Sequence, residues 1–255
     1  MQNRPKTDLE LTAMRHAGRI LASVLEVLVK NTKAGVKSKD LSALAHQELK
    51  QLGGKPAFLG VKSHDNGIPF PDIVCISISE EVQHSIPSER IIKNGDIVNF
   101  DFGVEYQGMI TDAGLTIPVG QVSSEVQHLL NQTKKALDMA LKIVKAGVKI
   151  RDISKTIETI LSEAKLGIVR ELVGHGVGHH LHEEPEIPNF TAGSNDYVLQ
   201  ENQTVAIEPI ATLGSGRIRL ADDGWTLLSA DNTYAAHFEH TIRVTKSGCE
   251  ILTQL

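Results

Sequence analysis

Hydrophobic residues along the chain recur at two different spacings, which divide it into helical and extended segments. Over residues 12–29 and 124–144, apolar side chains return every three or four positions, as in helices that bury one face. A second segment with the same spacing follows each of these, over residues 40–53 and 152–167. The pattern predicts two pairs of amphipathic helices.

In each pair, a ten-residue segment leads from the first helix into the second, and these two segments have nearly the same sequence. Residues 33–42 read KAGVKSKDLS and residues 145–154 read KAGVKIRDIS, so that seven of ten positions are identical. The general likeness of amphipathic helices does not explain so many identities, and an internal repeat explains them better. We expect the second helix of each pair to begin at an aspartate, Asp40 or Asp152, acting as N-cap, and to end at a glycine.

Apolar, β-branched segments typical of strands follow the helices in each half. The order helix–helix–strand, given twice, predicts an α+β fold with a pseudo-two-fold axis and helices on one face of a mostly antiparallel sheet. We see no linker, so a single domain over residues 1–255 is expected, with halves of about 1–120 and 121–255. The predicted strands lie within 72–79, 95–104, 109–119, 204–213 and 234–245.

Four carboxylates interrupt these apolar strands, two in each half: Asp101, Asp112, Glu208 and Glu239. A single such acid would more simply face water at a sheet edge or form a buried salt bridge. Four acids in matching places would repel one another and lose their hydration, and a cation removes both penalties. The pattern therefore predicts two divalent metal ions with bridging carboxylates.

The register of the first predicted hairpin decides how its two acids meet. A turn at Tyr106-Gln107 places Asp101 directly opposite Asp112, on the same face of the sheet. A turn at Gln107-Gly108 would shift that pairing. We favour the first register.

Histidines supply a third type of ligand. Four of the eleven, including His175 and His182, lie in GHGVGHHLHEEP, and the glycines beside His175 allow close backbone approach. His84 precedes the Asp101 strand and could reach the same centre. No separate role is assigned to His179 or His180. A lone histidine is more often a surface residue or a satisfied core residue, and we interpret five others in this way: His16, His46, His64, His128 and His237.

Composition narrows the class of protein. The formal net charge is −5 and no long basic run is present. The sequence therefore shows no positively charged region of the kind that binds nucleic acid or an anionic membrane. The two cysteines, Cys75 and Cys249, exclude a disulfide framework, and neither a signal peptide nor a membrane-spanning stretch is seen. We expect a cytoplasmic protein. No long exposed apolar helix calls for a partner, so we expect a monomer.

The motifs VCISISEEVQHSIP, GDIVNFDFGV, ITDAG, GHGVGHHLHEEP, VAIEPI and FEHTI, in this order over nearly the whole chain, resemble those of type I methionine aminopeptidases. This resemblance implies a single catalytic domain with the pita-bread fold. It also implies hydrolytic removal of the N-terminal methionine from nascent proteins and peptides, preferably before a small second residue.

The resemblance implies a role for each metal ligand. Asp101 should chelate one ion, Asp112 and Glu239 should bridge both, and His175 and Glu208 should complete the other. A metal-bridging hydroxide would be the nucleophile, and Glu208 would help to move its proton. First-row metals overlap in ligand preference, so the ions could be Co, Mn, Fe, Zn or Ni.

Further residues are implied to bind substrate. His182 resembles the family histidine at the scissile amide and the developing oxyanion, and His84 resembles the one that handles the leaving amine or the substrate backbone. A thioether offers little beyond packing, so the methionine pocket should be apolar. Its candidates, each of which could instead be ordinary core, are Phe58, Phe70, Cys75, Leu181 and Trp225.

Some positions depart from the family pattern, and they lie around the substrate pocket. Phe70 stands where a tyrosine is common and Leu181 where an aromatic residue is common. The other departures are Ser85 in place of a usual glycine, Ala113 in place of a usual hydroxyl residue, and a longer stretch over residues 60–70.

Two other functions are compatible with the fold. Enzymes that cleave X-Pro bonds usually carry an extra N-terminal domain, for which residues before the first ligand strand leave no room. Non-catalytic binding relatives should lack ligands or gain basic patches, whereas all five ligands are present here. An enzyme that trims nascent chains could contact the ribosome transiently, although no sequence feature indicates it.

Overall fold

The structure, a computed structural model, describes residues 3–63, 67–193 and 196–254. Residues 64–66, which include His64 and part of the long 60–70 stretch, lie outside this part. Four α-helices lie within the described residues, where the apolar periodicity predicts them: α1 (Asp8–Asn31), α2 (Ser38–Leu52), α3 (Ser124–Ile143) and α4 (Ile150–Glu163).

The two repeat segments have the same backbone conformation. Gly35 and Gly147 both have φ +93°, which L-residues with a Cβ rarely adopt. The predicted N-caps are wrong, because Lys37 and Lys149 occupy the cap positions of α2 and α4. Asp40 and Asp152 lie instead in the first helical turn, where a carboxylate interacts favourably with the helix dipole.

The helix ends agree with the sequence in one half only. Gly53 ends α2 in a left-handed conformation, as predicted. The helix α4 ends earlier than expected, at Glu163, and the left-handed residue after it is Lys165. Gly167 already belongs to strand β6.

Strands form antiparallel sheets between the helix pairs. Strand β4 (Ile97–Tyr106) pairs with each of three others: β1 (Lys55–Pro56), β2 (Val74–Ile78) and β5 (Met109–Pro118). A second sheet contains β15 (Cys249–Ile251), β14 (His240–Val244), β9 (Thr204–Ile207), β7 (Gly174–Gly176) and β8 (Glu183–Ile187). One three-stranded sheet contains β13 (Ala235–His237), β10 (Ile210–Thr212) and β6 (Gly167–Ile168). Another contains β11 (Ile218–Leu220), β12 (Leu227–Ser229) and β3 (Glu81–Gln83).

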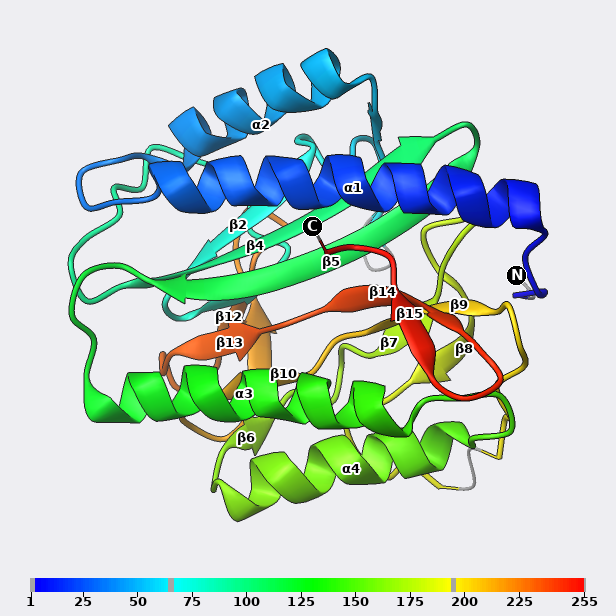
Figure 1. The fold of residues 1–255 in the computed structure, drawn as a ribbon. Helices are drawn as coiled ribbons and strands as arrows, with labels where there is room; N and C mark the ends of the chain where they lie inside the picture. Colours follow the sequence, from blue (N-terminus) through cyan, green and yellow to red (C-terminus); the bar gives the residue numbers. More distant parts are fainter. Residues whose placement is uncertain (1–2, 64–66, 194–195, 255) are drawn as a thin grey trace.

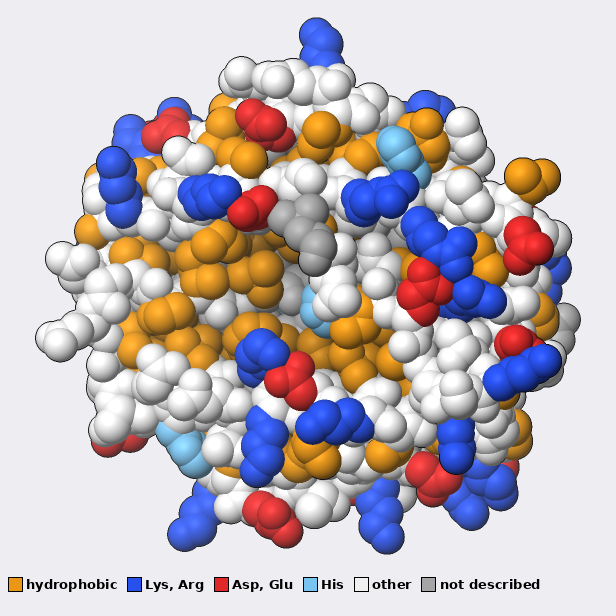
Figure 2. All heavy atoms as spheres, in the orientation of Figure 1, with side chains coloured by type: hydrophobic (Ala, Val, Ile, Leu, Met, Phe, Trp, Pro, Cys, Tyr) orange, Lys and Arg blue, Asp and Glu red, His pale blue; other side chains and the backbone are white. Residues whose placement is uncertain are grey.

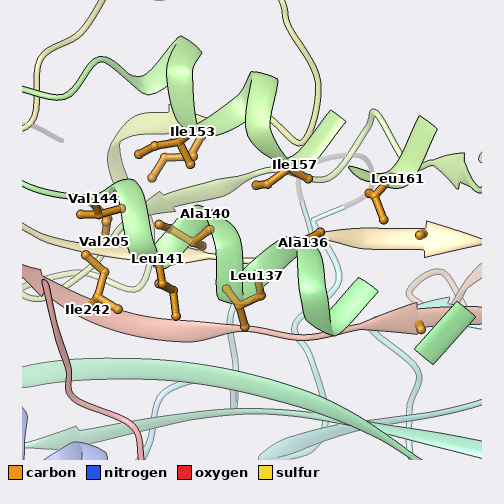
Figure 3. Close-up of a cluster of buried hydrophobic side chains, with 14 of the residues drawn as sticks. Ala136, Leu137, Ala140, Leu141, Val144, Ile153, Ile157, Leu161, Val205 and Ile242 are labelled. Atoms are coloured by element: carbon orange, nitrogen blue, oxygen red, sulfur yellow. The ribbon is translucent and has the colours of Figure 1, made fainter. Parts of the chain in front are cut away.

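Each half has its own apolar core. In the first half, α1 packs on β4, β5 and α2; in the second, α3 packs on α4 and on β10 and β13. Figure 3 shows the second core, where Leu141 of α3 lies beside Ile242, while Ile153 and Ile157 of α4 face α3. Figure 1 shows the helix pairs on either side of β5 and β14. The predicted α+β class with pseudo-symmetric halves is confirmed.

The two halves are joined along β5. The Glu239 amide donates to the Gly114 carbonyl oxygen over 2.8 Å. Two residues away, the Thr116 hydroxyl donates to the His237 carbonyl oxygen over 2.8 Å and accepts from the His237 amide over 2.9 Å. Strand β5 and residues 237–241 therefore run side by side, which brings the predicted ligands of both halves together.

On the face shown in Figure 2, side chains of Lys and Arg are interspersed with those of Asp and Glu, and hydrophobic side chains lie between them. Within the described residues, no helix combines the length and the apolar character that crossing a membrane requires.

Candidate metal centre

The carboxylates of the first half lie on neighbouring strands, in residue pairs two positions apart along the ladder. Asp101 of β4 is opposite Gly114, and Asp112 of β5 is opposite Gly103. The favoured register is therefore wrong, and the turn is Gln107-Gly108, whose φ values of +50° and +78° fit a two-residue hairpin. Asp101 and Asp112 are diagonal neighbours on one face, still within reach of a shared ion.

The carboxylates of the second half lie where two strands are interrupted. Sequence predicts both acids inside continuous strands, but Glu208 lies between β9 and β10 and Glu239 lies between β13 and β14. Pro209 has no amide hydrogen and cannot complete the ladder there. Pairs on both sides of the gap keep one register, which places Glu208 opposite Glu239.

His175 lies on β7 between β8 and β9. A Cβ at Gly174 would lie 2.5 Å from the Ala206 carbonyl oxygen, so the flanking glycine permits close strand packing. Nδ1 of His175 lies 2.9 Å from the carbonyl oxygen of Gly176, to which it can donate only as Nδ1–H. In that tautomer Nε2 keeps its lone pair for a metal, and this atom is 3.5 Å from Glu208 Oε1.

Ligand atoms of both halves converge. One ligand atom each of Asp112, His175 and Glu239 lie within 4.8 Å of one another, and all three residues are buried. Asp101 and Glu208, the other two predicted ligands, flank this triad; both are buried, and both act electrostatically on Glu239. The structure thus brings all five predicted ligand residues into one centre.

The electrostatics of this centre are those of crowded, dehydrated carboxylates. Burial raises the pKa of Asp101 to about 7. Burial, together with the neighbouring carboxylates, raises the pKa of Asp112, Glu208 and Glu239 well above the usual range. Burial also lowers the pKa of His175 to about 3, so its ring is neutral, as a ligand must be.

Several polar atoms of the centre are unpaired. Among the described residues, Asp101 Oδ1, Asp112 Oδ1 and Glu239 Oε1 are buried without a hydrogen-bond partner. Buried polar atoms in native proteins normally have partners. Carboxylate oxygens with one neutral imidazole are a donor set that divalent first-row ions accept, so these residues fit such ions.

Two predicted substrate-binding histidines lie beside the centre. The rings of His182 and His175 are 4.5 Å apart and nearly perpendicular. The backbone of His84 has φ +57°, which is uncommon for a residue with a Cβ and is often found at functional sites. Burial lowers the pKa of His84 to about 4, and His182 adds to this effect, so the two rings are electrostatic neighbours.

The predicted pocket residues come together in one apolar cluster. The rings of Phe70 and Trp225 are 5.1 Å apart, and Trp225 also lies 6.1 Å from the ring of His84. Burial raises the pKa of the Cys75 thiol, which keeps it protonated and unreactive. The cluster contains all five candidates: Phe58, Phe70, Cys75, Leu181 and Trp225.

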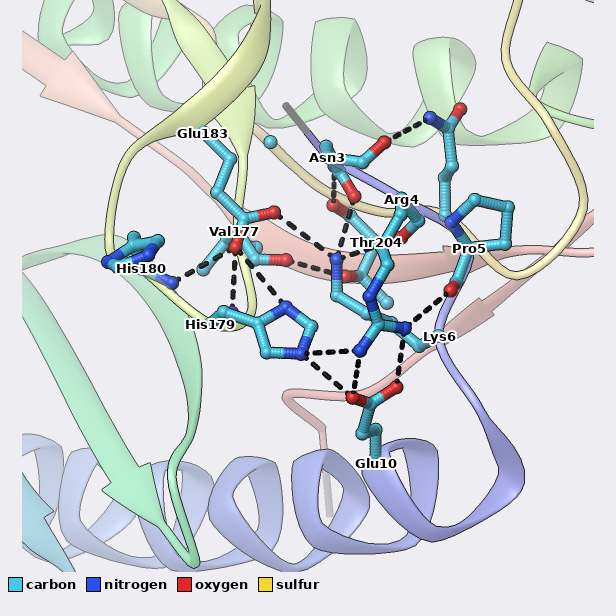
Figure 4. Close-up of polar contacts among 12 residues, drawn as sticks. Asn3, Arg4, Pro5, Lys6, Glu10, Val177, His179, His180, Glu183 and Thr204 are labelled. Carbon is cyan, nitrogen blue, oxygen red and sulfur yellow. Dashed lines mark hydrogen bonds and ion pairs between the residues drawn. The ribbon is translucent and has the colours of Figure 1, made fainter. Parts of the chain in front are cut away.

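Sequence reasoning missed an ion pair that holds the loop between β7 and β8 (Figure 4). The Lys6 ammonium group, fully buried, donates to Asn3 Oδ1 over 2.7 Å and to Glu183 Oε2 over 3.2 Å. The other Glu183 oxygen accepts from the amides of His179 and His180 over 2.7 and 3.0 Å. This loop contains His182, so the N-terminal segment helps to fix a predicted catalytic residue.

His237 was also missed, because it was interpreted with the lone histidines. It is fully buried, as a core histidine would be, but its Nε2 is unpaired and lies 3.6 Å from Glu239 Oε2. The available signal was its position two residues before Glu239, which places both side chains on one face of an extended segment.

Comparisons with known proteins agree with this geometry. Residues 12–246 match the model of metallopeptidase family M24. The chain is 39% identical over 250 residues to methionine aminopeptidase 1 of Bacillus subtilis, which covers 98% of each chain. A crystal structure of methionine aminopeptidase from Thermotoga maritima superposes with a TM-score of 0.94 at 36% identity, covering all of both chains.

A more distant structure shares the fold alone. The Xaa-Pro dipeptidase of Bacillus anthracis has a TM-score of 0.78 at 22% identity, and the match covers 98% of this chain but 62% of that one. The predicted pita-bread fold is confirmed by these superpositions.

Proposed function

Because the chain belongs to the methionine aminopeptidases of metallopeptidase family M24, we propose that its metal centre serves to remove N-terminal methionine from peptides and nascent chains. It is a metal-dependent hydrolase. The observation that carries this function is the buried convergence of Asp112, His175 and Glu239, with carboxylate oxygens that have no hydrogen-bond partner among the described residues.

Five residues would hold two divalent ions. Asp101 would bind one ion, Asp112 and Glu239 would bind both, and His175 and Glu208 would complete the other. Such ions, when bound, polarise a carbonyl group and lower the pKa of water. The diagonal placement of Asp101 and Asp112 and the opposed placement of Glu208 and Glu239 support this division.

Side chains of the protein would transfer the protons and hold the peptide substrate in position. Glu208 is buried, with one oxygen 3.5 Å from His175 Nε2, and would take the proton of the attacking water. His182, exposed beside His175, would donate to the oxygen of the scissile amide as charge develops there. His84 would bind the substrate backbone or the leaving amine.

The apolar cluster would bind the methionine side chain. Phe70, Cys75, Leu181 and Trp225 offer aromatic and sulfur contacts that suit a flexible thioether. A small second residue should be preferred, as the resemblance implies. We place the activity in the cytoplasm, in a single catalytic domain that acts as a monomer; free thiols at Cys75 and Cys249 suit that compartment.

Peptide cleavage tests this function. The purified protein would be chelated, then tested with Met-Ala-Ser and with an Arg-Pro-Pro peptide, before and after addition of Mn²⁺ or Co²⁺. We expect release of methionine from the first peptide only, and only with metal. Cleavage of the second peptide alone would assign the centre to X-Pro bonds, and turnover of neither by metal-loaded protein would point to a binding role.

A further inference from the structure

His237 occupies a space that its surroundings are shaped to provide. A Cβ on Gly114 would lie 2.2 Å from Cε1 and 2.5 Å from Nδ1 of its ring, so only glycine at this position leaves room for the imidazole. The backbone of His237 is held on both sides by the Thr116 hydroxyl. The ring is thus fixed by its neighbours and completely removed from solvent.

Two buried amides surround one ring nitrogen. Nδ1 of His237 lies 3.1 Å from Gln83 Nε2 and 3.3 Å from Asn99 Oδ1. The Asn99 amide in turn donates to Gln83 Oε1 over 3.2 Å, and the Gln83 amide group, which also hydrogen-bonds to Asp101, can donate to the ring. Nδ1 can accept from the Gln83 amide when Nε2 carries the hydrogen, whereas Asn99 Oδ1 could accept only from Nδ1–H.

The other ring nitrogen faces the metal centre. Nε2 lies 3.6 Å from Glu239 Oε2 and has no hydrogen-bond partner within the described residues. If Nδ1 accepts, Nε2 carries the hydrogen, and its positive end points at the carboxylate. When Glu239 is ionised, as a metal ligand must be, the opposite tautomer would set a lone pair against its carboxylate, which is unfavourable in a buried site. The Gln83 amide on one side and the ionised Glu239 carboxylate on the other therefore both favour Nε2–H.

We propose that His237 is a positioning residue for Glu239, and that its Nε2–H orients this carboxylate as a metal ligand. The inference rests on the proposed function, in which Glu239 binds both ions. At 3.6 Å the contact is electrostatic and longer than a hydrogen bond, but it acts in a buried environment that screens little. Groups that orient metal ligands typically change metal affinity by about 10–100-fold.

Calorimetric titration with Co²⁺ tests the proposal without using catalysis. Against the wild-type protein, His237→Phe keeps a buried ring without the donor and should bind Co²⁺ about 10–100-fold more weakly. His237→Gln keeps an N–H and should lose less. The matched control, Phe100→Leu, changes a fully buried ring of β4 in the first core and should leave Co²⁺ affinity unchanged.

The visible spectrum of the Co²⁺ protein separates positioning from general loss of packing. His237→Phe should alter it because the ligand geometry changes, whereas Phe100→Leu should not. Equal affinity and spectrum for His237→Phe and wild type would overturn the proposal. If His237→Phe does not fold, ¹⁵N-histidine spectra of the Zn²⁺-loaded wild-type protein, in which Glu239 is ionised, decide: Nε2–H supports the proposal, and Nδ1–H overturns it. Methionine release, measured separately, tests the proposed function by itself.

Discussion

The side-chain hydroxyl of Thr241 exchanges two hydrogen bonds with the backbone of Asp112, donating to its carbonyl oxygen over 2.7 Å and accepting from its amide over 2.9 Å. Thr241 belongs to the second half and Asp112 to the first, and both are buried. A predicted bridging ligand of the first half is therefore held in place by the second.

Thr241→Val keeps the shape of this side chain and removes both hydrogen bonds. We expect it to lower the free energy of unfolding by about 1–3 kcal/mol, since buried backbone groups of Asp112 lose their partner. Urea unfolding of the chelated protein measures this. Thr156→Val, which removes an exposed hydroxyl bonded within α4, is the control and should change stability by less than about 0.5 kcal/mol.

The chelated protein should lose stability as pH rises from 7 to 8.5. Burial raises the pKa of Asp101 to about 7 and that of Asp112, Glu208 and Glu239 well above the usual range, so the folded state holds protons that the unfolded chain has released. For each proton retained, the free energy of unfolding should fall by about 1.4 kcal/mol per pH unit. Urea unfolding at several pH values measures the slope.

Metal should remove that slope, because a cation stabilises the ionised carboxylates that protons otherwise neutralise. Asp112→Asn should make the slope of the chelated protein shallower by removing one titrating group. The buried histidines add little in this window, since their pKa values lie below it. A flat profile for the chelated wild-type protein would contradict the explanation.

Lys6→Met should destabilise the protein strongly. Lys6 and Glu183 form a buried ion pair, and removal of one partner leaves the other charge without compensation, at a penalty of about 3–5 kcal/mol. The double variant Lys6→Met with Glu183→Gln should recover much of this loss. Chemical unfolding provides the measurement.

An exposed ion pair gives the control for that prediction. Lys55→Met removes the partner of Glu105 at the surface and should change stability by less than about 1 kcal/mol. Glu183 also accepts from amides of the loop that carries His182. We therefore expect a lower kcat for methionine release in Glu183→Gln than in Lys55→Met at equal metal loading.

Trp225→Ala should weaken methionine binding more than catalysis. Its ring packs against Phe70 in the apolar cluster, and loss of apolar contact in a pocket weakens binding by about 1–3 kcal/mol, or roughly 10–200-fold in kcat/KM. Steady-state kinetics with Met-Ala-Ser should show the change mainly in KM. Phe190→Ala, a surface ring under Arg170, is the control, and an equal effect there would refute the pocket assignment.

Much of this fold could be predicted from the sequence because its signals are local. Helical periodicity located α1 to α4, and the repeat related the two helix pairs, in which Gly35 and Gly147 have the same φ. The four acids stood out because carboxylates are rare in apolar strands. Each of these features can be recognised within a short window of residues.

What could not be predicted depends on contacts between distant segments. The hairpin register depends on whether Gln107 and Gly108 both adopt positive φ, and the sequence is compatible with either turn. His237 looks like any lone histidine until Gln83 and Asn99 are placed around its ring. Lys6 gives no signal at all, because its partner lies 177 residues away.

Residues 3–6 are bound to segments that the ribosome makes much later. Asn3 donates to the Thr204 carbonyl oxygen, 201 residues further along, and Lys6 pairs with Glu183. At about 5–20 residues per second, the first segment waits roughly 10–40 s for its partners to emerge. The loop of His182 cannot be secured before then. A protein that trims the beginnings of other chains therefore secures its own His182 loop only after Glu183 and Thr204 have been synthesised.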